Sequence, residues 1–432
     1  MIEVLSINDG ERMTALRERL RNRNVAVDSS LMRQVEAIIE SVRREGDSAL
    51  VSYAALFDGC QLEPTDLRVS ESVLRESASR VDPEVLGALR EAIRRVHFFH
   101  SFQRQESWEV KAANGVRLGQ RITPIENVGV YVPGGSAAYT SSVVMNIVPA
   151  QIAGVDRIVV ATPPGTIEKN PSVAAALVEL NAMEVYAVGG AQAIAALAYG
   201  TETVARVDKI VGPGNRYVAA AKKLVFGVVG IDSIAGPSDV VVLADDTANA
   251  SFIASDLLAQ AEHGADASAI LVTTSERLAC AVAEELTELV RSLPRAEIVQ
   301  ASLTQYGAVI IVNEMEEACA LVNELAPEHL EIIAQDEDSI GRKIRNAGAI
   351  FFGEQTPEAV GDYLAGPNHV LPTSGAARFS SALGVHDFVK RTSTLKFSTA
   401  ALKSAAPMIA ALARAEGLEA HARSALIRLE SN

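Results

Sequence analysis

The amino-acid sequence predicts an α/β protein with two successive parallel units. Three observations support this fold class. Hydrophobic residues make up 48 % of the 432 residues and aromatic residues only 5 %, so the core should consist mainly of Ala, Val, Leu and Ile. Short β-rich runs alternate with helical segments from about residue 127 to 237, and a second alternation runs from about 240 to 352. Strand–turn–helix repetition of this kind is typical of doubly wound parallel sheets.

The first 110 residues are predicted to be mainly helical. Apolar residues recur every three or four positions at 30–45 and 82–104, and the Asp-Pro-Glu sequence at 82–84 is a good helix start. Residues 117–124 have the pattern of an extended segment that leads into the first α/β unit.

Each strand of the first unit is followed by a turn that contains Gly or Pro and then by a helical segment. The predicted strands are 128–132, 157–161, 184–188 and 209–211, and two of the helices are 172–181 and 191–198. In the second unit the predicted strands are 240–244, 269–273, 307–312 and 349–352, and the helices are 249–262, 276–292 and 315–325. Beyond residue 387, short pieces lead to an Ala-rich helix at 405–430.

Composition and charge argue against some partners and indicate the compartment of the protein. A net charge of −15 argues against nucleic acid and anionic membranes as partners, because both would repel the chain. We expect no secretory signal and no membrane span, since no window offers the roughly 18 apolar residues that a span needs. The isolated cysteines Cys60, Cys280 and Cys319 have neither zinc nor disulfide spacing, which indicates a cytoplasmic protein. Cys280 and Cys319 are expected to be buried packing residues, because their neighbours are apolar.

Three glycine-rich turns follow predicted strands. They are Tyr-Val-Pro-Gly-Gly-Ser at 131–136, Val-Gly-Gly-Ala-Gln at 188–192 and Val-Gly-Pro-Gly-Asn at 211–215. Ligands bind at the carboxyl ends of strands in open α/β sheets, because helix N-termini and free amides converge there. None of the turns has the G-x-G-x-x-G pattern of the usual dinucleotide motif. The residues leave two interpretations open, a nucleotide site or three tight turns.

Four of the seven histidines fall within a set of polar motifs. These motifs are Gln-Ala-Glu-His at 260–263, Pro-Glu-His at 327–329, Asp362, Asn-His at 368–369 and Glu-Gly-Leu-Glu-Ala-His at 416–421. Histidine binds zinc and moves protons near neutral pH. The clustering of a scarce residue beside carboxylates predicts a metal-assisted catalytic site.

Two of these motifs have a structural interpretation as well as a chemical one. Gln260 and His263 lie three residues apart near a helix end, so they share a face and could supply two metal ligands, or simply form a polar helix terminus. Glu328 and His329, at a predicted strand-to-helix junction, suit water activation and proton transfer, although a Glu there could merely stabilise the first helical turn. His369 lies in a loop that is too polar to be core.

The motifs together, in this order, resemble the histidinol dehydrogenase family over essentially the whole chain. The matching segments are 128–136, 188–198, 209–215, 235–238, 260–264, 326–330, 368–373 and 416–421. The resemblance implies a homodimeric, NAD-linked enzyme with one zinc ion per subunit. Such an enzyme oxidises L-histidinol to L-histidine through bound L-histidinal, in the final steps of histidine biosynthesis.

The resemblance also implies roles for individual residues. The implied zinc ligands are Gln260, His263, Asp362 and His421, the catalytic pair is Glu328 and His329, and the NAD contacts are Tyr131, Gln192 and Asn215. The implied substrate contacts are Ser238, Gln260, His263, His329, Asp362, His369, Glu416 and His421, with Ser141 lining the pocket.

The implied fold has two incomplete Rossmann-like, doubly wound domains with small N- and C-terminal extensions. The expected divisions are an extension at 1–23, a larger domain from 24–130 and 238–383 with the zinc and catalytic residues, an NAD-binding domain at 131–237 and an extension at 384–432. The last extension is expected to cross to the partner subunit, so that Glu416 and His421 act in the partner's site.

Two competing functions remain open at this point. A paralogue could oxidise another small alcohol, such as a sulfonated propanediol, although a sulfonate would call for an added arginine where Glu416 and His369 suit a cationic or imidazole-bearing substrate. A zinc hydrolase could use Glu328 to activate water while the glycine-rich turns are only structural. Hydrolysis needs no nicotinamide site, so dinucleotide binding separates the two classes.

Overall fold

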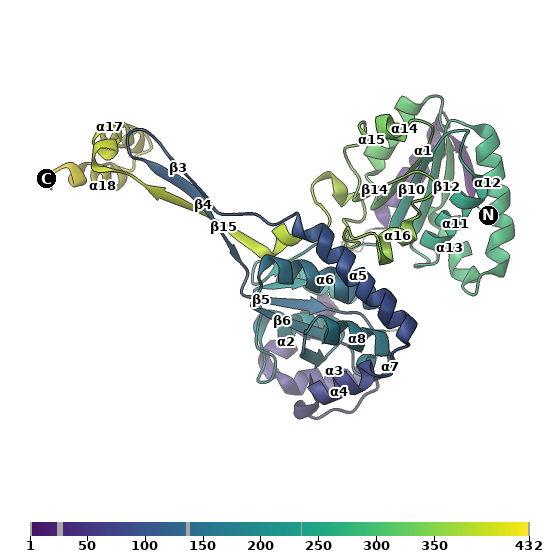
Figure 1. The fold of residues 1–432 in the computed structure, drawn as a ribbon, viewed down its shortest axis with the longest axis horizontal. Coiled ribbons are helices and arrows are strands. Elements are labelled where there is room, and N and C mark those ends of the chain that lie inside the picture. The colour runs from purple at the N-terminus through teal and green to yellow at the C-terminus, as the bar shows by residue number, and fades with distance from the viewer. Residues whose placement is uncertain (1, 24–28, 135–138, 235, 431–432) are drawn as a thin grey trace.

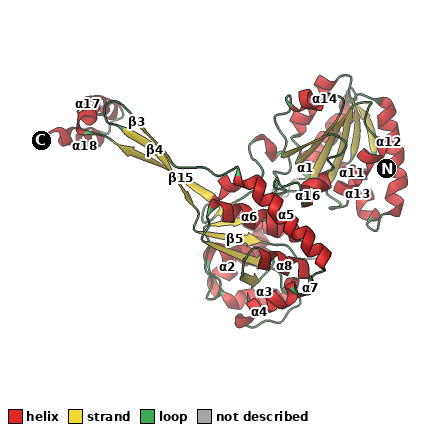
Figure 2. Cartoon of the chain, viewed as in Figure 1, coloured by secondary structure: helices red, strands yellow, loops and turns green. Residues whose placement is uncertain are grey.

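The computed structural model describes residues 2–23, 29–134, 139–234 and 236–430. Two six-stranded sheets, each flanked by helices, and a long arm make up the molecule (Figures 1 and 2). Gly135 and Ser136 of the first glycine-rich turn and Ala235 lie outside the described residues. Within the described ranges, no helix has both the length and the apolar character needed to cross a membrane.

The first sheet, called here the β5 sheet, has the strand order β2-β7-β6-β5-β8-β9. The strands are β2 (Arg68–Val69), β5 (Asn127–Tyr131), β6 (Arg157–Thr162), β7 (Glu184–Ala187), β8 (Lys209–Val211) and β9 (Gly230–Ile231). All pair in parallel except the short edge strand β2. Because β5 lies in the middle and later strands are added on both sides, the sheet is doubly wound.

Helices cover both faces of the β5 sheet. One face carries α2 (Ser29–Glu45), α3 (Asp47–Phe57), α9 (Gly190–Tyr199) and α10 (Arg216–Val225). The other face carries α4 (Glu71–Ala78), α5 (Pro83–Ser101), α6 (Thr140–Ala153) and α8 (Pro171–Glu179), with short η2 (Pro64–Asp66) and α7 (Thr166–Lys169) between elements. Helix α2 illustrates why these helices pack on the sheet. Its apolar residues Leu31, Val35 and Ile39 lie on one face and are all buried in one core with α9.

The second sheet, the β10 sheet, is parallel throughout and has the order β1-β12-β11-β10-β13-β14. The strands are β1 (Glu3–Ser6), β10 (Asp239–Ala244), β11 (Ser268–Thr273), β12 (Ala308–Ile311), β13 (His329–Ile333) and β14 (Ala349–Phe352). Its helices are α1 (Gly10–Asn22), α11 (Ala250–Ala261), α12 (Glu276–Leu289), η3 (Val290–Ser292), α13 (Ala296–Tyr306), α14 (Met315–Leu325), α15 (Glu337–Gly341) and α16 (Glu358–Tyr363).

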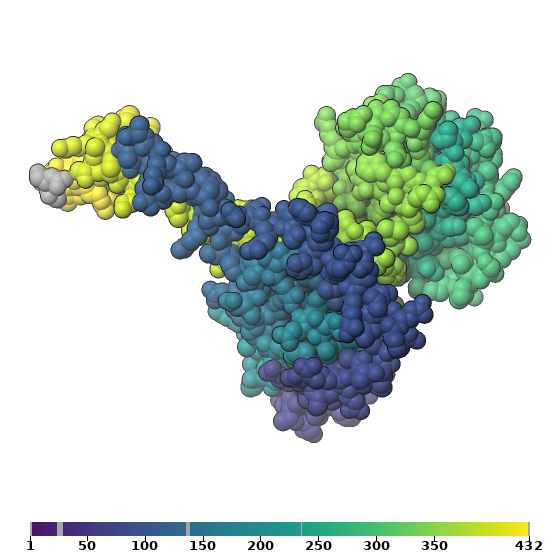
Figure 3. Space-filling view, viewed as in Figure 1, coloured from purple at the N-terminus to yellow at the C-terminus, as the bar shows by residue number. Residues whose placement is uncertain are grey.

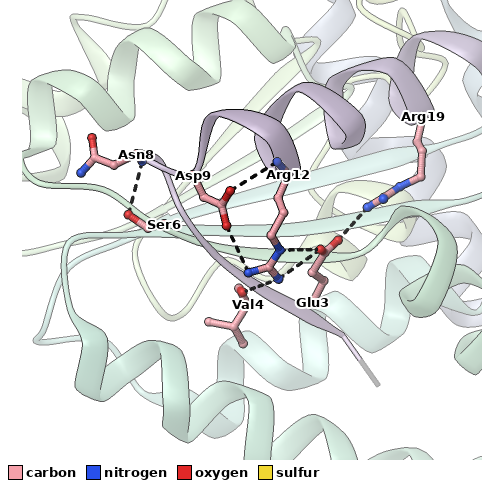
Figure 4. Close-up of polar contacts among 7 residues, drawn as sticks. All are labelled: Glu3, Val4, Ser6, Asn8, Asp9, Arg12 and Arg19. Carbon is pink, nitrogen blue, oxygen red and sulfur yellow. Dashed lines mark hydrogen bonds and ion pairs between the residues drawn. The ribbon is translucent and has the colours of Figure 1, made fainter.

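The N-terminal residues are an integral part of the β10 sheet. Strand β1 pairs with β12, and Met13 and Leu16 of α1 are buried in the same core as the sheet. Polar contacts join α1 to β1: Arg12 and Arg19 both bind the carboxylate of Glu3, and Asp9 accepts from Arg12 (Figure 4).

The arm projects away from both sheets (Figures 1 and 3). It is an antiparallel sheet of β3 (Trp108–Lys111), β4 (Arg117–Pro124) and β15 (Val389–Lys396), with the helices α17 (Thr399–Ala415) and α18 (Glu419–Glu430) at its tip. The short helices η4 (Ala376–Arg378) and η5 (Val385–Phe388) come before β15 in the chain. Among the described residues, Ala410, Ala413 and Ala422, with Leu426 against them, form a small core between the two tip helices.

The division into domains differs from the expectation. Residues 24–130 were expected to join 238–383, but the described helices between residues 29 and 101 pack on the β5 sheet, because their apolar faces share its two cores. The expected extension 1–23 belongs to the β10 sheet. The C-terminal segment is not a separate extension, since β15 pairs along its whole length with β4.

Most predicted elements are present, and four have the predicted bounds: β4, β8, α14 and β14. Two predictions are wrong. The residues after Glu328 form a strand rather than a helix, because His329–Ile333 is a fully buried run between β10 and β14. The single helix expected at 405–430 is broken, because Gly417 takes a left-handed conformation with φ 76°.

The expectation for one cysteine is also wrong. Cys319 is buried as predicted, but Cys280 is exposed, because α12 turns Leu278, Ala279 and Val282 toward the core instead.

Candidate active site

The three residues expected to contact NAD gather at the carboxyl edge of the β5 sheet. Tyr131 ends β5, Gln192 lies in the first turn of α9, and Asn215 is the N-cap residue of α10. The Asn215 side chain accepts hydrogen bonds from Tyr217 N and Val218 N at 3.0 and 3.2 Å. The N-termini of α9 and α10 both point to this edge, where their free amides favour an anionic group.

The turn backbones at this edge are held by buried side chains. The Tyr131 hydroxyl accepts a hydrogen bond from Gly190 N at 3.0 Å, and burial raises the pKa of Tyr131 to about 12, so this group is neutral. Gly212, with φ 113°, lies so close to the Tyr131 carbonyl that a β-carbon would collide with it. The buried ion pair of Lys222 and Asp232 binds Gly212 from both sides, through its O and its N. These contacts favour the interpretation of a built site over three unrelated turns.

A second cluster lies at the amino edge of the β10 sheet. Strands β10 and β13 are neighbours, and they begin at Asp239 and His329, next to Ser238 and Glu328. Helix α11 returns to this edge, since it connects parallel strands, and brings Gln260 in its last turn. His263 lies just beyond the end of α11 and is exposed. Thus the two clusters use opposite edges of their sheets.

The catalytic pair is buried and tied to Asp239. Glu328 and His329 are only 5 % and 4 % exposed. Glu328 Oε2 accepts from Asp239 N at 3.1 Å, and Glu328 N donates to Asp239 Oδ1 at 2.8 Å. His329 Nδ1 lies 3.3 Å from the Asp239 carbonyl oxygen. A carbonyl can only accept, so Nδ1 carries the proton and Nε2 keeps its lone pair.

Burial shifts the pKa values of both Glu328 and His329. Desolvation, followed by repulsion from Asp239, raises the pKa of Glu328 well above its ordinary value. Desolvation lowers the pKa of His329 to about 4, so the imidazole is neutral at neutral pH. A neutral imidazole is ready to accept a proton, whereas the Glu328 carboxyl needs a positive charge nearby to ionise.

Glu358 is a site residue that the sequence reasoning missed. It is 2 % exposed, and its Oε1 lies 3.7 Å from His329 Nδ1. The side chain of the fully buried Gln260 also faces it, and the amide nitrogen is placed to donate to Glu358 Oε2 at 3.0 Å. Burial, then the charges of Asp362 and Glu328, raise the pKa of Glu358 well above its ordinary value. The available signal was a carboxylate one helical turn before Asp362, directly after Pro357.

Asp362 and His369 are two further residues of the cluster at the β10 sheet. His369 Nδ1 lies 3.5 Å from Asp362 Oδ1. Burial alone would raise the pKa of Asp362, but the hydrogen bond from His369 and the nearby imidazoles of His329 and His263 hold it below its ordinary value. The Ser238 side chain also hydrogen-bonds Glu328.

Asn368, next to His369, connects this cluster to the β5 half of the molecule. Its side-chain nitrogen donates to Met145 O in α6 at 2.7 Å, and its oxygen accepts from Val370 N at 2.9 Å. Ser141 lies in the first turn of the same helix, α6. The loop that carries His369 is therefore anchored to the helix that follows β5.

Two predicted residues are not brought to the cluster by their own chain. Glu416 follows α17 and His421 lies in α18, at the tip of the arm, and both are exposed (Figure 1). Among the residues that the structure describes, no three His, Cys, Asp or Glu side chains of one chain form a metal site. Of the four expected zinc ligands, Gln260, His263 and Asp362 lie on or next to α11 and α16, and His421 lies at the tip of the arm.

Comparisons with known proteins agree with the geometry. A family model described as histidinol dehydrogenase matches residues 21–429. A histidinol dehydrogenase of Geobacillus kaustophilus is 54 % identical over 399 residues, which cover 92 % of this chain and 94 % of that protein. One of Bacillus subtilis is 49 % identical over 427 residues, which cover 98 % of each chain.

A solved structure extends the likeness to the whole fold. The crystal structure of histidinol dehydrogenase from Elizabethkingia anophelis is 36 % identical to this chain and has a TM-score of 0.92. The match covers 100 % of this chain and 98 % of that one. With a match over nearly the full length in sequence and in fold, the chain belongs to the histidinol dehydrogenase family and is an oxidoreductase.

Proposed function

We propose that the chain catalyses the NAD-linked, four-electron oxidation of L-histidinol to L-histidine as a zinc-dependent homodimer in the cytoplasm. The observation that carries the proposal is the buried Glu328–His329 pair, with Gln260 and Asp362 nearby. The β5 half of the same chain presents Tyr131, Gln192 and Asn215 at the carboxyl edge of its sheet. The relatives named histidinol dehydrogenase support the substrate and favour an oxidoreductase over a zinc hydrolase. The three free cysteines fit a reducing compartment.

The donor set suits zinc, which takes nitrogen and oxygen ligands at about four positions. Gln260, His263 and Asp362 would hold it together with His421 of a second copy of the chain. Zinc there would supply a Lewis acid that orients the amino alcohol and a positive charge that favours the ionised form of Glu328.

The protein residues then divide the proton transfers. Neutral His329, oriented by the Asp239 carbonyl, would take the hydroxyl proton of the alcohol at Nε2. NAD⁺, when bound, would supply the acceptor for the hydride of the carbinol carbon, so that L-histidinal is formed. Ionised Glu328 takes a proton from the water that adds to the aldehyde. His329 would then take a hydroxyl proton of the hydrate, and a second NAD⁺ would supply the acceptor for the second hydride. The acid formed in this way loses one more proton to become the carboxylate. The sum is two NADH per alcohol, with the protons released to solvent.

The arm supports the dimer. Trp108, Leu395, Phe397 and Leu412 on the arm are 53 %, 71 %, 47 % and 70 % exposed. Exposed apolar side chains gathered on one thin element mark a protein interface, because isolated chains rarely leave them in water. A second copy that covers the arm would receive Glu416 and His421 at its own site.

The deciding experiment measures NADH formed per L-histidinol, with L-histidine as the product, before and after chelation of the metal. Two NADH per substrate, loss on chelation and recovery with zinc are expected. One NADH with a released aldehyde would contradict the proposal. A sulfonated propanediol serves as the matched alternative substrate, and faster turnover of it would identify a substrate-shifted paralogue.

A further inference from the structure

Three elements carry the site of the β10 half, and a pair of carboxyl groups with no assigned role lies where these elements meet. Gln260 is on α11, His329 is on β13, and Asp362 is on α16. Asp256 lies one helical turn before Gln260, and Glu331 lies two residues after His329, on the same face of β13. Helices α11 and α16 are in contact.

Glu331 binds the start of α16. It is 1 % exposed, and its Oε1 accepts a hydrogen bond from Glu358 N, the first amide of α16, at 2.9 Å. The partner is 27 residues away in the chain, so this is a tertiary contact and not a local helix cap. A helix of six residues has little stability of its own, so the groups bound to its ends determine where Glu358 and Asp362 lie.

The side chains of Glu331 and Asp256 lie within hydrogen-bonding reach of each other. Glu331 Oε2 is buried and has no donor among the described residues. Two carboxyl groups form a hydrogen bond only if one of them keeps a proton. Burial raises the pKa of Glu331 and of Asp256 above their ordinary values, in agreement with a retained proton.

We propose that Asp256 and Glu331 share one proton and act as positioning residues that lock α11, β13 and α16 together, which sets the distances between Gln260, His329 and Asp362. Neither residue is among the expected metal ligands or substrate contacts. The consequence for zinc and turnover rests on the proposed function, whereas the shared proton and the anchoring of α16 do not.

Four variants of the full-length holoenzyme test the pair. Glu331→Gln keeps an oxygen for Glu358 N and a donor for Asp256, and Asp256→Asn keeps a donor for Glu331, so both should retain activity and bound zinc within a few-fold. Glu331→Met and Asp256→Leu keep volume but lose the contact. They should lower zinc affinity and kcat by about 10- to 100-fold, the usual cost of losing a group that orients a metal ligand. A Glu331→Met protein with wild-type zinc affinity and kcat would overturn the positioning role.

Two further readouts are independent of activity. Infrared difference spectra should show loss of a protonated carboxyl band in Glu331→Gln and in Asp256→Asn. The matched control is Asp47→Asn, which changes a buried carboxyl group that accepts hydrogen bonds from Thr201 and Thr203 rather than meeting a second carboxyl group. Hydrogen exchange across residues 357–364 should quicken in Glu331→Met and stay slow in Glu331→Gln.

These readouts separate the two proposals. If histidinol is not oxidised but the carboxyl band and the exchange pattern behave as described, the pair stands and the proposed function fails. An unchanged carboxyl band in both amide variants would overturn the shared proton even in an active enzyme. If Glu331→Met fails to fold, Asp256→Leu and the two amide variants still decide the result.

Discussion

At the residue scale, burial shifts the pKa values of two neighbouring side chains in opposite directions. Desolvation lowers the pKa of His329 to about 4 and raises that of adjacent Glu328. A neutral imidazole and a carboxyl that ionises only beside a positive charge can therefore act as two different bases in one pocket.

The first prediction tests this division of roles. Glu328→Gln keeps the shape of the side chain but cannot take a proton, so it should slow the oxidation of histidinal more than that of histidinol. His329→Asn should slow both half-reactions by about 10²- to 10⁴-fold, because each needs a base at Nε2. Rates measured separately on the two substrates check this, and equal losses for Glu328→Gln in both would contradict it.

The second prediction concerns pH and stability. Burial raises the pKa of Glu331 from 4.5 to about 9, so the folded chain binds this proton more tightly than the unfolded chain. The stability that it contributes is complete below about pH 4.5 and is lost as the pH rises toward 9. The glutamine of Glu331→Gln does not titrate. As the pH rises from 4.5 toward 9, the free energy of unfolding of this variant should therefore increase relative to that of the wild type, by up to about 1.4 kcal/mol per pH unit. Urea denaturation of both proteins at several pH values measures the difference, and a constant difference would refute the expectation.

At the scale of elements, the tip of the arm depends on one sharp turn. Gly417, with φ 76°, joins α17 to α18, and a β-carbon there would meet nothing within 4 Å. Substitution would therefore act only through backbone strain. Because the tip core consists of Ala410, Ala413 and Ala422, small strain should suffice to displace α18 and His421.

The third prediction follows from that turn. Gly417→Ala should cost about 1 to 2 kcal/mol locally, and should lower bound zinc and activity while leaving the global unfolding midpoint near wild type, because the tip shares no core with the sheets. Gly87→Ala is the matched control: Gly87 lies in α5 with open space around it, so alanine should be neutral or slightly stabilising. Elemental analysis and calorimetry compare the two. Full zinc content in Gly417→Ala would contradict the expectation.

At the scale of the whole molecule, the residues expected at the site lie partly on the sheets and partly on the arm. The cluster around His329 lies at the amino edge of the β10 sheet, whereas Glu416 and His421 lie on the projecting tip (Figure 1). In the proposed twofold dimer, each tip would reach the other chain and would complete its site.

The fourth prediction is complementation between two inactive chains. One carries His421→Ala, and the other carries both Glu328→Gln and His329→Asn. Random reassortment makes about half of the dimers mixed, each with one intact site, so about a quarter of wild-type activity should return. Native mass spectrometry confirms exchange, and no recovery after confirmed exchange would show that His421 serves its own chain.

The sequence by itself determined the class of fold and marked many residues of the candidate site. The alternation of buried strands and amphipathic helices is a local pattern, so it predicted β4, β8, α14 and β14 with their observed bounds. The polar motifs likewise marked residues of the cluster at the β10 sheet, such as His329 and Asp362, because carboxylates beside scarce imidazoles stand out in an apolar chain.

Only the tertiary structure decided which segments share a core and which polar groups meet. Helix α2 could have covered either sheet, and its apolar face alone does not select the β5 sheet. A run such as His329–Ile333 has no period that separates a buried strand from a helix, so its place between β10 and β14 determined the outcome. Glu358 and Glu331 gain their roles from neighbours far away in the chain, because contacts between distant residues leave no mark in local sequence.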